Sequence, residues 1–556
     1  MNQEPAMPVP AEKSDDQPVS SRFHAIIPSL IGACILLLVV GAQCRLVVHQ
    51  NEGHFVYPLD DTYIHLSIAR NLVQHHVWGV TPYQFSSASS SPGWTLLLAC
   101  AMRICGVHLL LPLFLNLIFA VLFLVLADRI ICRWFAATPI WYRLLLQVGM
   151  IFCVSLPNLV LIGMEHTAQT FFVTAMAALS AEVLSTAKDR PLSTSVMIGW
   201  LAAAFFACAL RYETVFVVLP VLLGLLWRRR LRAAALFAIF SGLPPLLFAL
   251  FSMLHSPFWL PYSVLAKAAI NYGVDGGSLL HLWYSLTGPT LRPILILSAA
   301  IFLARFSAHG LWEKTQTFLA LFLFVCIEQM ALAPSGWLMR YESYLFGFGL
   351  LSCGLAGADF VSHVRKHHLL TQQRTLAYSA VGLLAAGAVL PSFAYRAYHG
   401  LKEPVQATHD RYLEHIQMAR FISDYYDHDV IVVNDIGAIS YYSHAKILDL
   451  VGLGSEEPLL AMHGHGKFMS SKELDQWAQS QGARVAILQT DWDVVQRVLP
   501  GNWIFIGAWH LPRNVAFNSR TVGFYAIDPQ YANTLRENFN AFPLSPEVVR
   551  IRPKTP

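Results

Sequence analysis

The sequence predicts a polytopic α-helical membrane protein with about eleven transmembrane helices, followed by a C-terminal soluble α/β domain. Of its 556 residues, 55% are hydrophobic and only 13% are charged, which is about half the charged fraction of a soluble protein. Apolar runs fill 24–395, and they are continuous rather than alternating. We interpret these runs as helices, because a helix satisfies its own backbone hydrogen bonds within lipid. Residues 396–556 have the composition of an ordinary globular domain.

The chain begins with a polar, proline-rich stretch, 1–22, which we expect to be a disordered cytoplasmic tail. The apolar run from Ile26 to Ala42 is not followed by a small-residue cleavage site, so we interpret it as a retained first span. It opens a transmembrane domain that we predict over 23–395. The expected spans are 24–43, 110–131, 143–162, 167–186, 194–210, 212–227, 233–254, 289–305, 316–334, 343–362 and 375–394.

Basic residues in short loops predict the orientation, because such loops stay in the cytoplasm. With the N-terminus inside, the expected spans place every basic cluster on the cytoplasmic side. These clusters are Arg129 with Arg133 and Arg143, Lys188 with Arg190, Arg228 to Arg232, Arg305 with Lys314, and Arg365 with Lys366. The same topology puts the loop 44–92, the loop 255–288, the connection 335–342 and the domain 396–556 outside.

One apolar segment, Ser91 to Cys105, is too short for a full span and contains Arg103. We interpret it as an interfacial helix on the outer side of the membrane. The alternative is an ordinary span, which would invert the topology of everything downstream.

The C-terminal region alternates between two kinds of segment. Strand-like runs cover Asp429 to Asp435, Ala483 to Thr490 and Val522 to Asp528, and helix-like segments cover Tyr412 to Tyr426 and Ser471 to Gln481. This alternation predicts an α/β domain with a partly parallel sheet. Asn434, Asp435 and Gly437 predict a strand-to-helix turn capped by an aspartate.

Composition also excludes several classes of protein. The net charge of +4 is too small for a nucleic-acid-binding protein. All nine cysteines precede the soluble domain and none forms a CxxC pair, so neither a disulfide framework nor a zinc site is indicated.

The first outer loop carries the most informative pair of residues, Asp60 and Asp61 at the start of an amphipathic helix. Adjacent carboxylates repel each other unless a cation or a proton lies between them, or unless one serves as a general base. The alternative is simple helix capping, for which one aspartate is sufficient. We expect both side chains to face solvent.

Several segments in order along the chain resemble one enzyme superfamily. They are "DDTYI" (Asp60 to Ile64), "ARN" (Ala69 to Asn71), "SPGWTLLLA" (Ser91 to Ala99), "GMEHTAQ" (Gly163 to Gln169), "LRYET" (Leu210 to Thr214), "LPYSVLAKA" (Leu260 to Ala268), "MRYESY" (Met339 to Tyr344) and "VNDIGAISYYSHAKILDLVGL" (Val433 to Leu453). Together they resemble the GT-C superfamily of membrane glycosyltransferases. The closest likeness is to the terminal arabinofuranosyltransferases of mycobacterial cell walls and their bacterial relatives.

This resemblance implies transfer of a sugar from a polyprenyl-phosphate donor to an envelope glycan or lipid. The reaction would occur on the outer face of a bacterial cytoplasmic membrane, with the domain 396–556 in the periplasm and the loop 44–92 as the catalytic loop. Asp60 or Asp61 would take the acceptor proton. A divalent cation (Mg²⁺, Mn²⁺ or Ca²⁺) is the candidate cofactor, with Asp60, Asp61 and Glu165 as its ligands. Tyr63 and His65 would support the site.

A lipid-phosphate leaving group needs cations at the membrane surface, and three basic residues end near the outer face in the expected topology. They are Arg211, Lys267 and Arg340. Basic residues in such places can instead extend to lipid headgroups. Two further alternatives stay open for the whole chain: a transporter or flippase for a lipid-linked molecule, and a non-catalytic relative that binds glycans.

Overall fold

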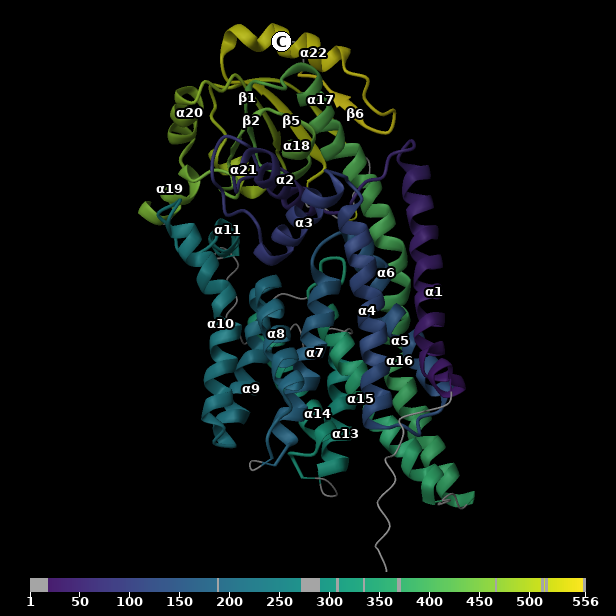
Figure 1. The fold of residues 1–556 in the computed structure, drawn as a ribbon. Helices are drawn as coiled ribbons and strands as arrows, with labels where there is room; N and C mark the ends of the chain where they lie inside the picture. The colour runs from purple at the N-terminus through teal and green to yellow at the C-terminus, as the bar shows by residue number, and fades with distance from the viewer. Residues whose placement is uncertain are drawn as a thin grey trace, which may run out of the picture.

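The computed structural model describes residues 19–187, 190–271, 291–306, 310–333, 336–367, 372–465, 468–511, 515 and 519–553. Side chains are described for these residues apart from 19–25, 267–271, 363–367, 372–386 and 388. Figure 1 shows a long helical bundle with a smaller part, built around a β-sheet, at one of its ends. The chain is thus a polytopic helical membrane protein with a C-terminal α/β domain, as predicted.

The bundle consists of apolar helices that follow the predicted spans. They are α1 (Val19–Gln50), α4 (Leu111–Trp134), α5 (Ile140–Cys153), α6 (Leu156–Ile162), α7 (His166–Ser185), α8 (Thr194–Leu210), η1 (Tyr212–Thr214), α9 (Val215–Trp227), α10 (Leu231–Met253), α13 (Leu291–Phe306), α14 (Lys314–Leu332), α15 (Ser343–His367) and α16 (Gln372–Arg411). Within the described residues, six helices are long and apolar enough to cross a membrane, and the number is seven if α5 and α6, which are bent by 42° at the break between them, are counted as one span. Each predicted span falls on a helix, or on the bent pair α5 and α6 for 143–162. Helices α8, α9 and α13, with 17, 13 and 16 residues, have at most the minimum length for a crossing.

Three short helices lie between the bundle and the sheet: α2 (Asp60–His75), α3 (Pro92–Cys105) and α11 (Tyr262–Asn271). Helix α3 is the segment predicted as interfacial, and its 14 residues are too few to span a bilayer. It packs closely on α8: a Cβ at Gly93 would lie only 2.6 Å from the carbonyl oxygen of Ala209, so glycine allows this close approach.

The soluble domain holds a mixed six-stranded sheet in the order β2-β1-β3-β5-β4-β6. Its elements are η2 (Tyr412–Ile416), α17 (Gln417–Tyr425), β1 (Val430–Val433), α18 (Gly437–Tyr442), β2 (Lys446–Asp449), α19 (Glu457–His465), α20 (Ser471–Ser480), β3 (Val485–Gln489), α21 (Asp493–Val498), β4 (Ile504–His510), β5 (Thr521–Ala526), η3 (Pro529–Tyr531), α22 (Ala532–Ala541) and β6 (Val549–Ile551). Strands β2, β1 and β3 are parallel, and β3, β5, β4 and β6 pair antiparallel. The predicted partly parallel sheet is therefore confirmed.

Helices cover both faces of this sheet, because successive residues of a strand point to opposite faces. On β1, Ile431 and Val433 pack in one hydrophobic cluster with Phe421 of α17. Val432 packs in a different cluster on the other face, with Leu474 of α20. Both faces are thus buried, which is why β1 and β3 read as continuous apolar runs in the sequence.

The two parts of the molecule are joined by a helix rather than by a loop. Helix α16 continues without a break through residues 395 and 396, where the sequence predicted a domain boundary, and η2 and α17 extend it into the soluble domain. Five residues of π-helix at Tyr412–Ile416 mark the transition. A continuous helix transmits position and rotation better than a flexible linker.

The basic clusters gather at the end of the bundle away from the soluble domain. Arg228 and Arg230 both donate to the carbonyl oxygen of Thr186, and the guanidinium of Arg228 lies 5.0 Å from the ring centroid of Trp312. Three connections of the chain, those between α7 and α8, α9 and α10, and α13 and α14, therefore meet at this end. Lys188 lies outside the described residues.

Candidate active site

Helix α2 begins at the aspartate pair and turns the two side chains in different directions. Neighbouring residues on an α-helix are about 100° apart around the axis. Asp60 is buried against the soluble domain, with 5% of its surface exposed, whereas the side chain of Asp61 is 31% exposed. The expectation that both face solvent is wrong for Asp60, because α18 covers that side of α2.

The Asp60 carboxylate is bonded to the soluble domain. It accepts the backbone N–H groups of Gly437, at 2.5 Å, and Ala438, at 2.8 Å. Burial and the nearby carboxylate of Asp435 raise the pKa of Asp60 to about 8. Both oxygens of Asp60 are occupied by these N–H groups, and Asp60 does not line the pocket beside Asp61. Asp60 is therefore less suited than Asp61 to the general-base role predicted for the pair.

Asp61 instead faces a buried guanidinium. Its Oδ2 lies 3.0 Å from Nη2 of Arg340, whose side chain is 4% exposed. The same Arg340 nitrogen donates to the hydroxyl of Tyr341, and its guanidinium lies 4.8 Å from the Tyr341 ring centroid. This burial rules out the alternative in which Arg340 extends to lipid headgroups.

A left-handed turn delivers Arg340 to this place. Gly336, Trp337, Leu338 and Met339 have φ values of +86°, +45°, +56° and +56°. Non-glycine residues in this region cost about 1–2 kcal/mol each. Three polar side chains hold the turn: Glu342 accepts the N–H of Gly336, Asn158 donates to the carbonyl of Leu338, and Arg396 donates to that of Met339.

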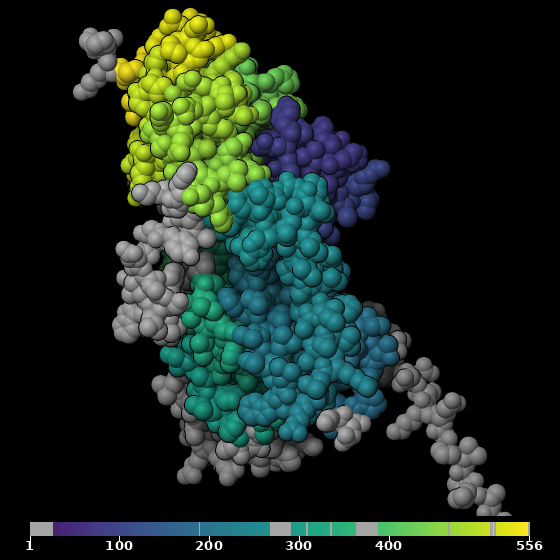
Figure 2. Space-filling model, turned by 90° about the vertical axis from the view of Figure 1, so that its left-hand side faces the viewer, coloured from purple at the N-terminus to yellow at the C-terminus, as the bar shows by residue number. Residues whose placement is uncertain are grey.

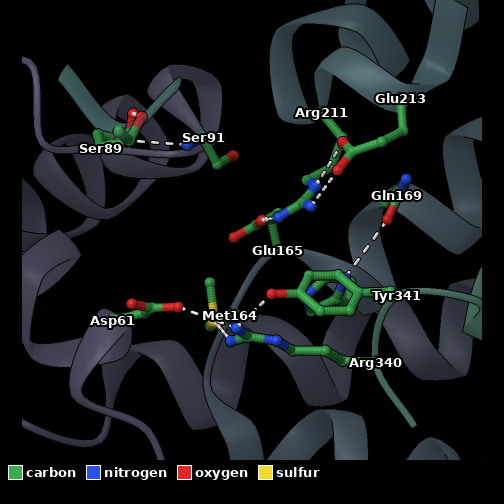
Figure 3. Close-up of polar contacts among 12 residues, drawn as sticks. Asp61, Ser89, Ser91, Met164, Glu165, Gln169, Arg211, Glu213, Arg340 and Tyr341 are labelled. Atoms are coloured by element: carbon green, nitrogen blue, oxygen red, sulfur yellow. Dashed lines mark hydrogen bonds and ion pairs between the residues drawn. The ribbon is translucent and has the colours of Figure 1, made fainter. Parts of the chain in front are cut away.

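A second ion cluster lies beside the first. Nη1 of Arg211 lies 2.8 Å from Oε1 of Glu165, and the other side of the same guanidinium makes a two-point contact with Glu213 at 3.0 and 2.5 Å. Nε2 of His65 lies 3.8 Å from the second oxygen of Glu165. The Tyr341 ring stands between the two guanidinium groups, 5.7 Å from that of Arg211 (Figure 3).

A small pocket adjoins Asp61. Its walls come from four segments of the chain: α2, the serine-rich loop before α3, α11 and the soluble domain. The lining residues are Asp61, Ile64, His65, Ala88, Ser90, Ser263 and Leu453. The pocket thus combines one carboxylate with hydroxyl groups, which can both donate and accept hydrogen bonds.

The predicted metal ligands do not meet. Asp60 faces α18, Asp61 faces Arg340, and Glu165 pairs with Arg211. Within the described residues, the group that can hold a metal ion is Asp60 with His415 and Asp435, whose ligand atoms lie within 4.8 Å of one another.

Arg411 enters this Asp–His–Asp group, 3.9 Å from Asp60 and 3.5 Å from Asp435. The guanidinium already supplies a positive charge to both carboxylates and would repel a dication.

The structure brings together most of the predicted residues at one end of the bundle, but in two groups. Asp61, His65, Glu165, Arg211 and Arg340 lie around the pocket and its ion pairs. The other group faces the soluble domain and contains Asp60 and Tyr63, whose ring contacts Tyr441 and Tyr442. The side chain of Lys267 lies outside the described residues.

Several residues of the site were not predicted. Glu213 and Tyr341 stand close in the sequence to the predicted residues Arg211 and Arg340, within the same quoted segments. Their position in the sequence could therefore have identified them. Arg411 and His415 carried no such signal, because they lie in a helix about 350 residues from Asp60. The predicted strand-to-helix turn after β1 is present, but Asp435 does not cap it; the cap on α18 is Asp60.

Comparison with solved structures identifies the fold. The structure of ArnT from Cupriavidus metallidurans in the apo state matches with a TM-score of 0.50 at 12% identity, covering 90% of this chain and 98% of that one. Its form bound to undecaprenyl phosphate gives 0.51 at 11% identity with the same coverage. The archaeal oligosaccharyltransferase AglB from Archaeoglobus fulgidus gives 0.46 at 10% identity, covering 96% of this chain and 76% of that one.

At these identities the likeness to ArnT is one of fold alone. The closer resemblance to arabinofuranosyltransferases stays a prediction. A family model described as a domain of unknown function (DUF8728) matches residues 404–525, from the end of α16 to β5. No curated protein matches the chain.

Proposed function

We propose that this chain is a glycosyltransferase that moves a sugar from a polyprenyl-phosphate donor to an envelope glycan or lipid. The observation that carries the proposal is the Asp61–Arg340 ion pair at one end of a GT-C-type bundle, with Asp61 also lining a small pocket that contains two serines. A carboxylate and a buried guanidinium in contact can serve a proton acceptor and an anionic leaving group in one step. ArnT, which shares the fold, binds undecaprenyl phosphate.

In this reaction the acceptor hydroxyl oxygen bonds to the anomeric carbon while the bond from that carbon to the phosphate oxygen breaks. The hydroxyl proton passes to Asp61, and the electron pair of the broken bond leaves with the polyprenyl phosphate. Arg340 holds the phosphate, since a planar guanidinium matches its oxygens in a two-point contact. A phosphate that takes Arg340 also removes the counter-ion of Asp61, which makes that carboxylate a stronger base.

The remaining predicted residues divide between positioning and binding. Arg211 is shared by Glu165 and Glu213, so its charge is already balanced, and it holds Glu165 beside His65. Lys267 is proposed as a second phosphate ligand, as the sequence predicted. In this arrangement Arg340 is the main phosphate ligand and Arg211 is a positioning residue.

The membrane side follows from charge. The site lies at the end of the bundle opposite the basic loops, and by the positive-inside rule we propose that it faces the outer side of the cytoplasmic membrane. The soluble domain is then periplasmic or extracytoplasmic. A lipid-linked donor suits that compartment because its sugar is already on the outer face.

Two measurements on the purified full chain in detergent test this function. Native mass spectrometry with undecaprenyl phosphate measures binding of the lipid product. Incubation with a lipid and glycan extract of the host envelope measures transfer, as a time-dependent gain of undecaprenyl phosphate. We expect Asp61→Asn to lower the transfer rate by about 10²–10⁴-fold while the chain still binds the lipid. Asp493→Ala is the control, because that side chain is 83% exposed on the soluble domain. An Asp61→Asn protein with unchanged transfer would contradict the assignment.

A further inference from the structure

Helix α2 presents two faces to two different parts of the molecule. Seen along the axis of α2, Arg70 is rotated by about 80° from Asp60 in one direction, and Asp61 by about 100° in the other direction. Arg70 and Asp61 therefore lie on opposite sides of the helix. Asp60, Tyr63 and Arg70 contact the soluble domain. Asp61 lines the pocket together with His65, one turn further along. One short helix thus carries both the proposed base and the contacts to the soluble domain.

Asp60 binds the start of α18. The first N–H groups of a helix have no partner within it, and Asp60 accepts two of them, at Gly437 and Ala438. The approach is so close that a Cβ at Gly437 would lie 2.2 Å from the carbonyl oxygen of Asp60. Only glycine fits here without moving one helix away from the other.

Arg70 binds the other end of the same helix. Its Nη1 donates to the carbonyl of Tyr441 at 2.7 Å, and its Nη2 donates to that of Ser440 at 2.8 Å. The last carbonyls of a helix, like the first N–H groups, lack partners within it. Since Asp60 and Arg70 contact opposite ends of α18, the two helices run parallel and are bonded at both ends.

We propose that Asp60 and Arg70 are positioning residues that fasten α18 to α2, so that the soluble domain sets where Asp61 stands. This inference rests on the function proposed above. We call the contact between Asp60 and Arg70 on one side and the ends of α18 on the other the α2–α18 clamp. The soluble domain is then part of the active site rather than an appended binding module.

The geometry indicates that Asp60 and Arg70 position α2, and do more than join the two domains. Bonds at both ends of α18 restrict sliding and rotation of α2, and either movement would carry Asp61 away from Arg340. A misplacement of about 1 Å can cost roughly 10²-fold in rate. The soluble domain also reaches the pocket directly, because Leu453 lines it beside Asp61.

Hydrogen–deuterium exchange tests the clamp without any substrate. The amide groups of Gly437 and Ala438 are protected by Asp60, so Asp60→Ala in the full chain should increase exchange of a peptide covering 437–442. Gly437→Ala should do the same, whereas Gly501→Ala is its control, since nothing lies within 4 Å of a Cβ there. Asp61→Asn should leave exchange in 437–442 unchanged.

Transfer measurements then separate positioning from catalysis. Asparagine keeps an oxygen that accepts one N–H group, so we expect Asp60→Asn to transfer faster than Asp60→Ala, with the latter roughly ten- to hundred-fold below wild type. Arg70→Lys should likewise exceed Arg70→Met. Affinity for undecaprenyl phosphate should stay within about twofold in all four variants, because Arg340 is untouched.

Each outcome bears on one proposal. If Asp60→Asn and Asp60→Ala abolish transfer equally while exchange in 437–442 stays at the wild-type level, Asp60 is itself a catalytic group and the clamp is overturned. If Asp60→Ala increases that exchange and transfer is unchanged, the clamp joins the domains without positioning Asp61. If instead Asp61→Asn transfers normally, the proposed function fails, while the exchange data still show whether α18 is held by Asp60 and Arg70.

Discussion

At the scale of single residues, Asp60 and Asp61 show how two adjacent carboxylates come to differ. They are neighbours on one helix, but successive residues of a helix point in different directions. Asp60 therefore contacts the soluble domain, and Asp61 contacts Arg340. The first is enclosed by backbone N–H groups, and the second keeps access to a pocket. Neighbouring side chains on a helix rarely share a function that requires both to face one ligand.

Arg340→Lys tests the planar phosphate contact. Arg340 meets Asp61 and lies over the Tyr341 ring at the same time, and a lysine ammonium is a point charge that cannot reproduce both contacts. We expect affinity for undecaprenyl phosphate to fall about tenfold. Native mass spectrometry across a lipid titration measures it. Arg497→Lys, at an exposed surface pair, is the matched control, and equal affinities for Arg340→Lys and the control would remove Arg340 from the phosphate site.

Asp449 predicts a pH dependence of stability in the soluble domain. Its buried carboxylate accepts the N–H groups of Val451, Leu453 and Gly454. Burial nevertheless raises the pKa of Asp449 to about 6. Between the unfolded value of about 4 and this folded value, only the folded state holds the proton. The stability from this group therefore falls as pH rises through that window and is constant above it.

The measurement is thermal unfolding in detergent between pH 4.5 and 7.5. In Asp449→Asn the contribution of this group to the pH dependence below about pH 6 should disappear. A wild-type pH profile retained in Asp449→Asn would show that another group titrates there.

At the scale of elements, the left-handed turn before α15 is stabilised by contacts outside itself. The turn places Arg340, and its strain is offset by bonds from α6 and α16. The central contact is the fully buried pair of Glu342 and Arg396, with Oε1 and Nη1 2.6 Å apart. Strained backbone of this kind occurs at functional sites where surrounding structure holds it in place.

A double-mutant cycle tests this support. Glu342→Gln or Arg396→Met alone leaves one buried charge without its partner, and such a change costs about 3–5 kcal/mol. The double variant leaves no buried charge, so its unfolding midpoint in detergent should be lowered by less than the sum of the two single changes. Additive effects would mean that the two side chains do not act as a pair.

At the scale of the whole molecule, charge separates the two ends of the bundle. The basic loops lie at one end, and the site and the soluble domain lie at the other. Figure 2 shows the soluble domain resting on the end of the bundle, next to the segment that carries α2. This polarity is what a membrane with a positive-inside bias selects.

The topology predicts where a C-terminal reporter works. A reporter that is active only in the periplasm, fused after Pro556, should be active, and a cytoplasmic reporter at the same position should be silent. Fusions after Trp227, next to the basic loop that begins at Arg228, should show the opposite pattern. Cytoplasmic activity of the C-terminal fusion would reverse the orientation and contradict an outer-face donor site.

Much of the architecture was predictable because it depends on local properties. Continuous apolar runs specify membrane helices, and each predicted span falls on a helix or on the bent pair α5 and α6. Strands β1, β3 and β5 are buried on both faces of the sheet, so they appear in the sequence as continuous apolar runs and could be predicted. Strands β2, β4 and β6 were missed; β2 and β6 are the edge strands of the sheet and have only 4 and 3 residues.

The site was predictable in part, for a different reason. The sequence marks which segments carry unusual polar residues, and Asp61, Glu165, Arg211 and Arg340 come together from four of these segments. It does not mark partners. The segment after Val433 was quoted for its pattern, but nothing in it indicated that Gly437 contacts Asp60, 377 residues away.

The membrane-embedded helical class, the soluble α/β domain and the chemical character of the outer loop could all be predicted from the sequence, because each follows from composition and periodicity within a short window. Which of the two adjacent aspartates meets Arg340 and which binds α18 became clear only from the three-dimensional structure. That choice depends on the packing of a helix between two separate parts of the chain. Packing of that kind is a property of long-range contacts, and a local pattern carries no record of it.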